Sequence, residues 1–386
     1  MRSACILILF FFSSLFISAQ DKPYADYSIS LLTVGPGPSL VDNFGHSAIR
    51  VKSSTYDYVF NYGIYDFDDP NFYAKFTQGR LLYKLGVQSF NSFKRGYEYQ
   101  NRWVKEQHLD ITLAQKEAVI SYLLENAKPE NQYYKYDYFS NNCATKPYDI
   151  LKYTIGFKLD DKSIPSESIT YRSIIHARSG INSWGSFGID LALGSLIDRE
   201  LTIEELTFLP DYLYEIISSS ENLAGKAIVK KDKKIVQAVE LDQPFNFFGP
   251  FPFFLLISLL IIWITYKNYR SQKRSKWVDT MLFLFTGMVG IILLFLWFGT
   301  DHIWTKFNYN LLWAFPLNLI LIQQSQQAEP KNWFKKYLKL LVILLCLMTL
   351  HWSIGIQQFA PSLMPLIIAL IVRYLYLISS LKRTNY

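Results

Sequence analysis

The chain has 386 residues, of which 50% are hydrophobic, and its longest apolar stretches lie near the two ends. Its formal net charge is +7, but residues 249–386 hold 13 Lys and Arg against 3 Asp and Glu, and Arg2 adds one more positive charge. Residues 21–248 therefore carry a net charge of −4, which removes the main support for nucleic-acid binding, since that function favours a basic domain. We expect no nucleic-acid partner.

The first segment, MRSACILILFFFSSLFISAQ, has the pattern of a secretory signal peptide. One basic residue, Arg2, precedes an apolar run over residues 4–17, and the small residues Ser18 and Ala19 follow this run. The run is short for a membrane span and ends in small residues, as cleaved signals do. We predict a signal peptide over residues 1–19, so the mature chain begins outside the cytoplasm.

Residues 20–247 are predicted to form one periplasmic domain of mixed α and β structure. Strand-like runs end at Gly, Pro or polar residues, and one stretch with helical spacing ends before a proline. The predicted strands are DYSISLLTVGPG, HSAIRVKSS and YDYVFNYGIYDF, and the predicted helix is TLAQKEAVISYLLENAKP. A second helix is expected to begin at Cys143, after an aromatic run and the polar turn Ser140-Asn141-Asn142.

Residues 248–386 are predicted to form an all-α transmembrane domain of about five helices. Five apolar segments approach the ~20 residues that cross a bilayer, although the third and fourth are short; they span 249–266, 278–299, 310–323, 338–352 and 362–381. Lys and Arg follow the first, third and fifth segments, and the other loops hold only Lys306. By the positive-inside rule, the protein lies in the inner membrane with its N-terminal domain in the periplasm and its C-terminus in the cytosol.

Polar residues stand out within this apolar region. Pro316 and Asn318 predict a broken helix that lines a polar cavity, and Arg373 is expected to snorkel to the cytosolic interface. The periplasmic loop GTDHIWTKFNYN is either an interfacial aromatic belt or a site for a lipid headgroup or a lipoprotein amine, since polar groups at membrane depth are costly unless used. Its candidate binding residues are Asp301, His302, Asn308 and Asn310, and His302 is also an alternative general base.

Cys143 is the one thiol expected in the mature periplasmic domain, because Cys5 leaves with the signal and Cys346 lies in the fourth apolar segment. A single thiol in an oxidising compartment is either buried as a small hydrophobic residue or used in chemistry. Cys143 follows Asn-Asn at a predicted helix start, where backbone N–H groups and the helix dipole lower a thiol pKa. This setting favours a catalytic thiol.

A catalytic thiol needs a neighbouring base. The periplasmic domain offers His46, His108 and His176, and the latter two occupy ordinary surface or helix-end positions. His46 lies in DNFGHSAIRV, at the start of a predicted strand, and we predict that it is the base for Cys143.

The order of the two motifs resembles a known branch of cysteine enzymes. FGHSAIRV followed by NNCATKPYDI is similar to the permuted papain-like fold of NlpC/P60-like and lecithin retinol acyltransferase-like proteins, whose histidine strand precedes the cysteine helix. Longer stretches resemble the Lnb-type lipoprotein N-acyltransferases of Gram-negative bacteria over nearly the whole chain: LLTVGPG, FNYGIYDFDDPNFYAKFTQGRLLYKL, LALGSLID and TDHIWTKFNYNLLWAFPLN. Lys146 stands where that family's motif has arginine, which keeps the cation but loses bidentate recognition.

The resemblance implies acyl transfer from a phospholipid to the α-amine of the diacylglyceryl-cysteine of a lipoprotein. Cys143 attacks the ester and forms a thioester, which the amine then attacks, while His46 moves the protons. The partners are then a phospholipid donor, a diacylated lipoprotein and the membrane, and no cofactor or metal is expected.

Further site residues follow from the permuted order. Asp57 or Asn61 on the next strand is expected to orient His46, and we favour Asn61, although a purely structural asparagine is the alternative. Asn142 or the N–H of Cys143 is expected to stabilise the oxyanion, and Tyr62 is a further candidate binding residue. Asp42 and Arg50 are expected to form a solvated pair or to support the site.

Two other functions compatible with this sequence remain. The first is a membrane-anchored papain-like cysteine hydrolase, acting as a peptidoglycan amidase or peptidase or as a phospholipase, with the same Cys143 and His46 pair. The second is a receptor or scaffold in which Cys143 is simply buried.

Overall fold

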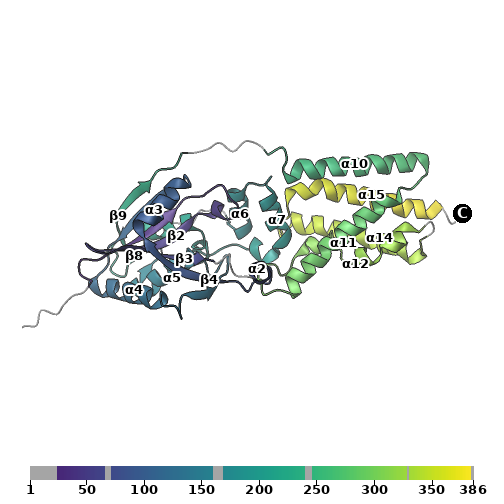
Figure 1. The fold of residues 1–386 in the computed structure, drawn as a ribbon. Helices are drawn as coiled ribbons and strands as arrows, with labels where there is room; N and C mark the ends of the chain where they lie inside the picture. The colour runs from purple at the N-terminus through teal and green to yellow at the C-terminus, as the bar shows by residue number, and fades with distance from the viewer. Residues whose placement is uncertain (1–23, 66–70, 160–167, 240–245, 328–329, 384–386) are drawn as a thin grey trace, which may run out of the picture.

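The computed structural model describes residues 24–65, 71–159, 168–239, 246–327 and 330–383. The predicted signal peptide lies outside these residues. The structure has a sheet-rich α/β part followed by a helical part (Figure 1). This order agrees with the prediction that a domain of mixed α and β structure precedes a helical domain. The two parts lie end to end, with helices α6, α7 and α2 between the sheet and the long helices.

The first part is built on a seven-stranded antiparallel sheet with the order β6-β4-β3-β2-β1-β5-β9. Its strands are β1 (Ser28–Val34), β2 (His46–Lys52), β3 (Asp57–Ile64), β4 (Leu82–Ser89), β5 (Val104–Leu109), β6 (Tyr133–Lys135) and β9 (Val229–Val236). The central strands alternate between two apolar layers, since side chains along a strand point to opposite faces. A small second sheet pairs β7 (Phe157–Lys158) with β8 (Glu221–Asn222).

Helices cover both faces of the sheet. Helix α3 (Phe90–Tyr99) packs on the face of Leu32 and Val59, and α4 (Leu113–Asn126) and α5 (Thr145–Ile155) pack on the face of Leu31 and Phe60. The remaining helices of this part are α2 (Phe72–Thr77), α6 (Tyr171–Ser179), α7 (Trp184–Ala192), α8 (Ile203–Leu206) and α9 (Pro210–Ser219). The predicted helix at 112–129 is confirmed as α4, and a capping box between Thr112 and Gln115 fixes its start.

The helical part contains α10 (Pro250–Ser271), α11 (Lys276–Phe298), α12 (Leu317–Ile320), α13 (Ile322–Gln326), α14 (Asn332–Ser353) and α15 (Met364–Arg383). Within the described residues, three helices are long and apolar enough to cross a membrane: Pro250–Ser271, Lys276–Phe298 and Pro361–Ser380. They confirm the first, second and fifth predicted segments. Helix α14 carries three lysines near its start, and its crossing stays a prediction.

The third predicted segment is broken, as its proline and asparagine indicated. Helices α12 and α13 are short, and both pack on α11, where a Cβ on Gly287 would lie 2.4 Å from the backbone nitrogen of Leu319 in α12. Asn318 is fully buried; its amide donates to Thr286 Oγ1 at 2.7 Å and accepts from the Tyr337 hydroxyl at 2.5 Å. The Asn318 side chain therefore bonds to residues of the neighbouring helices α11 and α14. It does not line a polar cavity, as we had expected.

Arg373 does not snorkel, so that expectation is wrong. Arg373 and Asp279 are both 0% exposed, and Arg373 Nε lies 2.7 Å from Asp279 Oδ1. Arg373 Nη1 also donates to Asn268 Oδ1 at 2.9 Å, while Arg274 Nε donates to the other oxygen of Asp279 at 2.8 Å. These bonds tie α10, α11 and α15 together. A buried charge needs such partners because its desolvation is costly.

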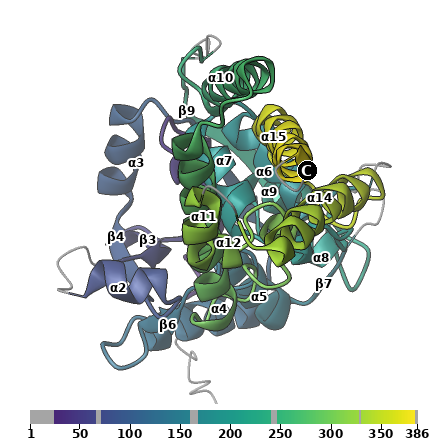
Figure 2. The same cartoon turned by 90° about the vertical axis from the view of Figure 1, so that its right-hand side faces the viewer.

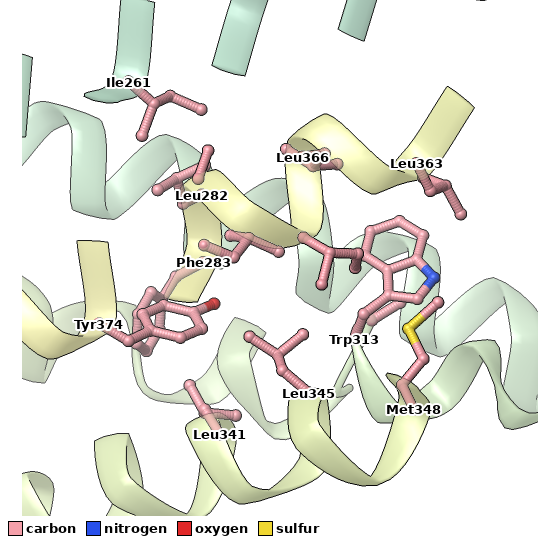
Figure 3. Packing of buried hydrophobic residues seen from close by; sticks show 14 of the residues in the cluster. Ile261, Leu282, Phe283, Trp313, Leu341, Leu345, Met348, Leu363, Leu366 and Tyr374 are labelled. Carbon is pink, nitrogen blue, oxygen red and sulfur yellow. The ribbon is translucent and has the colours of Figure 1, made fainter. Parts of the chain in front are cut away.

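The core of the helical part lies where α11, α14, α15 and the 310–316 region meet. Trp313, Leu345, Met348, Leu363 and Leu366 pack together there (Figure 3). Seen along the helices, α10 lies beside α15, and α11 lies beside α12 (Figure 2). Although α10 and α11 are consecutive, they do not pack closely against each other.

Candidate functional site

Cys143 lies two residues before α5, in the polar turn that leads into this helix. Asp137 and Asn141 pair through their backbones, and Asp137 Oδ1 accepts the N–H of Ser140 at 2.8 Å. A Cβ on Gly63, whose φ is +94°, would lie 3.4 Å from the Cys143 Cβ. This contact and the positive φ favour glycine there.

Asn142 holds the turn and the helix start together. Its Oδ1 accepts the N–H groups of Ala144 at 2.7 Å and Thr145 at 2.9 Å. Its Nδ2 donates to the carbonyl oxygens of Tyr138 at 2.7 Å and Phe208 at 2.9 Å. All the hydrogen bonds that a side-chain amide usually makes are taken. Asn142 therefore caps the helix, and its side chain has no N–H left for the oxyanion role we predicted.

His46, the first residue of β2, interacts with Cys143. Burial alone would raise the pKa of Cys143. The charge of His46 and its hydrogen bond to the thiol outweigh this effect and lower the pKa of Cys143 below the usual thiol value. Backbone N–H groups of Ser47 and Cys143 lower it further. Although burial lowers the pKa of His46, interaction with Cys143 raises it above the usual value. Each group therefore favours the charged form of the other.

Asn61, on β3, contacts the other side of the imidazole. His46 Nε2 lies 2.5 Å from Asn61 Oδ1, which leaves Nδ1 for the thiol. The alternative orienting residue, Asp57, instead makes a 2.7 Å ion pair with Arg50. Of the two candidates, Asn61 is the one that contacts the ring, and its role in orienting His46 stays a prediction.

Tyr62 lies on the opposite face of β3 from Asn61, as strand alternation requires. It belongs to the buried layer against α4 and α5, where its hydroxyl donates to Asn126 Oδ1 at 3.4 Å. Its role as a binding residue stays a prediction.

Aromatic residues and an arginine surround the pair. Tyr97 stacks on the His46 ring at 6.4 Å, and burial raises its pKa to about 12. Burial, followed by the charge of Cys143, also raises the pKa values of Tyr134, Tyr136 and Tyr138. The half-buried thiol therefore lies among half-buried aromatic rings.

Arg102 is a site residue that the sequence did not indicate. It is buried, its guanidinium lies 5.0 Å from the Tyr97 ring centre, and its Nη1 donates to Asp42 Oδ1 at 2.8 Å. Its charge opposes the imidazolium of His46. Asp42 therefore pairs with Arg102 and not with Arg50, whose second partner is Glu106 at 2.9 Å. The expected pair of Asp42 and Arg50 is wrong, because Arg102, two residues before β5, is the basic residue that faces Asp42.

The other two histidines are bonded elsewhere. His108 Nδ1 lies 3.1 Å from Ser30 Oγ, and His176 Nε2 lies 2.8 Å from Asp190 Oδ2. Lys146 packs its ammonium 4.9 Å from the Tyr134 ring centre, and burial lowers its pKa. In the described part of the chain, no group of three or more His, Cys, Asp or Glu side chains could hold a metal ion.

Comparison with protein families identifies both parts of the molecule. The Lnb N-terminal periplasmic domain matches residues 19–177, and the Lnb transmembrane domain matches residues 242–385. The chain is an Lnb-type protein. Searches of curated proteins and of solved structures found no match. The two Lnb domains indicate a membrane enzyme of the lipoprotein N-acylation type, with its N-terminal domain in the periplasm.

The loop after α11 joins the Lnb transmembrane domain to the periplasmic domain. Asp301 pairs with Arg80 at 3.1 Å and with Lys135 at 3.5 Å. His302 Nε2 lies 3.0 Å from the Phe76 carbonyl oxygen. The imidazole that interacts with Cys143 is that of His46, so nothing here supports His302 as the base.

Asn308 and Asn310 form the buried part of the same junction. Asn308 Nδ2 donates to the Leu191 carbonyl at 2.8 Å, and Asn310 Nδ2 donates to the Asp190 carbonyl at 3.0 Å. Both side chains are 1% exposed. They hold the end of α7, so binding of a headgroup by these two residues stays a prediction and would require the junction to open.

Proposed function

We propose that the chain is a thiol-dependent lipoprotein N-acyltransferase. It moves a fatty acyl group from a phospholipid, through a thioester on Cys143, to the α-amine of a diacylglyceryl-cysteine. The observation that supports this proposal best is the Cys143, His46 and Asn61 arrangement in a domain bonded directly to membrane helices. A thiol at that junction can reach lipid esters and lipoprotein N-termini at the membrane surface.

The first half-reaction forms the thioester. Cys143 gives its proton to His46, and the thiolate attacks the ester carbonyl. The N–H of Cys143 stabilises the oxyanion, since the Asn142 side chain is fully bonded within the protein. The C–O bond then breaks, and His46 returns the proton to the departing lysophospholipid oxygen.

The second half-reaction resolves the thioester. The neutral α-amine attacks the thioester carbonyl, His46 takes the proton from nitrogen, and the amide forms as the Cys143 thiolate leaves. Water is the competing nucleophile. The half-buried tyrosines around Cys143 shield the thioester on several sides, which favours transfer over hydrolysis.

We also propose a permuted papain-like fold for the periplasmic domain. The histidine strand β2 and the asparagine strand β3 precede the cysteine helix α5, in the order of that fold. The proposal also includes three points about location: the signal peptide is cleaved, the protein lies in the inner membrane, and its C-terminus lies in the cytosol. The positively charged loops after the first, third and fifth apolar segments support this orientation.

Mass spectrometry tests this function. The N-terminal lipopeptide of a co-expressed diacylated lipoprotein is measured in cells without their own N-acyltransferase. We expect a mass gain of one acyl chain with the wild type and with Cys346→Ser, whose thiol is exposed on α14, and no gain with Cys143→Ser. If membrane-inserted wild type gives no gain, the proposal fails. Released lysophospholipid without lipoprotein acylation would indicate a phospholipase.

A further inference from the structure

An apolar groove of about 520 Å³ lies between α10 and α11. We propose that this groove binds one acyl chain of a membrane phospholipid. The groove exists because α10 packs beside α15, while α11 packs beside α12 and α13 (Figure 2). Consecutive helices therefore diverge and leave an uncovered strip between them.

The lining of the groove determines the chemistry of its ligand. Every lining side chain is aliphatic, aromatic or methionine; those central to the argument are Phe254, Leu260, Ile264, Met281, Phe285 and Trp313. Such a lining offers almost no hydrogen bond, and a polar ligand there would leave its own groups unpaired. The ligand is therefore a hydrocarbon.

The size of the groove favours a chain over a protein helix. Its lining on α10 runs from Phe253 to Ile264, which is about 16 Å along a helix and about half the thickness of a bilayer core. A transmembrane helix is about 30 Å long, roughly twice the length of this lining, so the groove suits one extended acyl chain better than a spanning helix.

The position of the groove indicates which lipid occupies it. Both α10 and α11 are candidate spans, so a groove between them opens toward the bilayer, whose bulk component is phospholipid. The periplasmic helix α7 closes one end with Trp184, Phe187 and Leu191. The Trp184 indole donates to the Phe248 carbonyl at 2.8 Å, which marks the polar boundary where the phospholipid headgroup would lie.

The groove is connected to the catalytic domain through α7. Leu191 lines the groove, and its carbonyl accepts the Asn308 amide at 2.8 Å. A lipid in the groove therefore contacts the same helix that anchors the junction between the two domains. The inference that the groove binds lipid does not depend on the proposed function. Only the further step, that the bound lipid is the acyl donor, rests on it.

Photo-crosslinking tests the groove without turnover. Full-length Cys143→Ser chain is placed in phosphatidylethanolamine and phosphatidylglycerol vesicles that contain phosphatidylethanolamine with a diazirine on one acyl chain. We expect adducts on groove-lining residues of α10 and α11. Leu260→Trp fills the groove and Met281→Trp fills it from the facing wall, and either change should reduce labelling about ten-fold, the cost of roughly two methylenes of lost burial.

Leu256→Trp is the matched control, because Leu256 is 68% exposed on α10 and does not line the groove. It should leave labelling unchanged. Equal labelling of all faces of α10, or labelling that neither groove variant reduces, would overturn the proposal. Preferential labelling by a diazirine-bearing diacylated lipopeptide would overturn the choice of phospholipid. Lipoprotein acylation without groove labelling refutes the groove alone, and groove labelling without acylation refutes the proposed function alone.

Discussion

The indole N–H of Trp304, in the loop after α11, donates to Asp137 Oδ2 at 2.9 Å, in the turn that precedes Cys143. Trp304 also packs edge-on against Phe139, with ring centres 4.9 Å apart. A residue of the transmembrane domain therefore supports the segment that positions the proposed nucleophile. This contact explains how the membrane domain can contribute to the chemistry without itself supplying a reacting group.

Replacing this indole tests the contact. Trp304→Phe keeps most of the packing and removes the donor to a carboxylate, a bond of about 1.5 kcal/mol or more. We expect lipoprotein N-acylation to slow about ten-fold. Trp333→Phe, on the exposed side of α14, is the control and should have no effect. Equal rates for both variants would show that Trp304 does not support the site.

The orientation of His46 is expected to depend on Asn61. Asn61→Ala removes the acceptor 2.5 Å from His46 Nε2, and a lost hydrogen bond to a charged ring corresponds to a fall of about 10- to 100-fold in acylation rate. Tyr58→Phe, at a 40% exposed position on the same strand, should leave the rate unchanged. If Tyr58→Phe is the more damaging change, Asn61 does not orient the base.

The ionisation of Cys143 predicts a pH dependence. The pKa of Cys143 is lowered and that of His46 is raised, so the thiolate extends to lower pH and the imidazolium to higher pH than in the isolated groups. Alkylation of Cys143 by iodoacetamide, in a Cys346→Ser background, should therefore stay fast below the usual thiol pKa. His46→Ala leaves burial as the dominant influence and should move the pKa of Cys143 above its usual value. An unchanged profile in His46→Ala would contradict the pair.

The proposed catalytic pair was predictable because its signals are local. A single thiol at a helix start and a histidine at a strand start can both be recognised from neighbouring residues. Asn61 required only the order of two adjacent strands, and β2 and β3 do pair. The mixed domain followed by apolar helices was equally clear from periodicity and composition.

Features that depend on docking could not be predicted. Arg102 reaches Asp42 from a position 60 residues away, which depends on the pairing of β1 with β5. In the sequence, Asn308 and Asn310 are polar residues next to a predicted membrane span. Only the docked position of α7 shows that their side-chain amides donate to backbone carbonyls of that helix. The buried state of Arg373 likewise depends on Asp279, which lies 94 residues away on another helix.

The Asp279 cluster predicts an asymmetry in membrane-domain stability. Asp279→Leu leaves Arg274 and Arg373 close together without their shared carboxylate, and an uncompensated buried charge costs about 3–5 kcal/mol. Arg373→Leu leaves Asp279 paired with Arg274, so we expect a smaller loss of thermal stability in detergent. Lys273→Leu, on the exposed turn after α10, serves as the control. Equal losses of melting temperature in Arg373→Leu and Asp279→Leu would contradict this prediction. They would show that Arg274 alone does not compensate the buried carboxylate of Asp279.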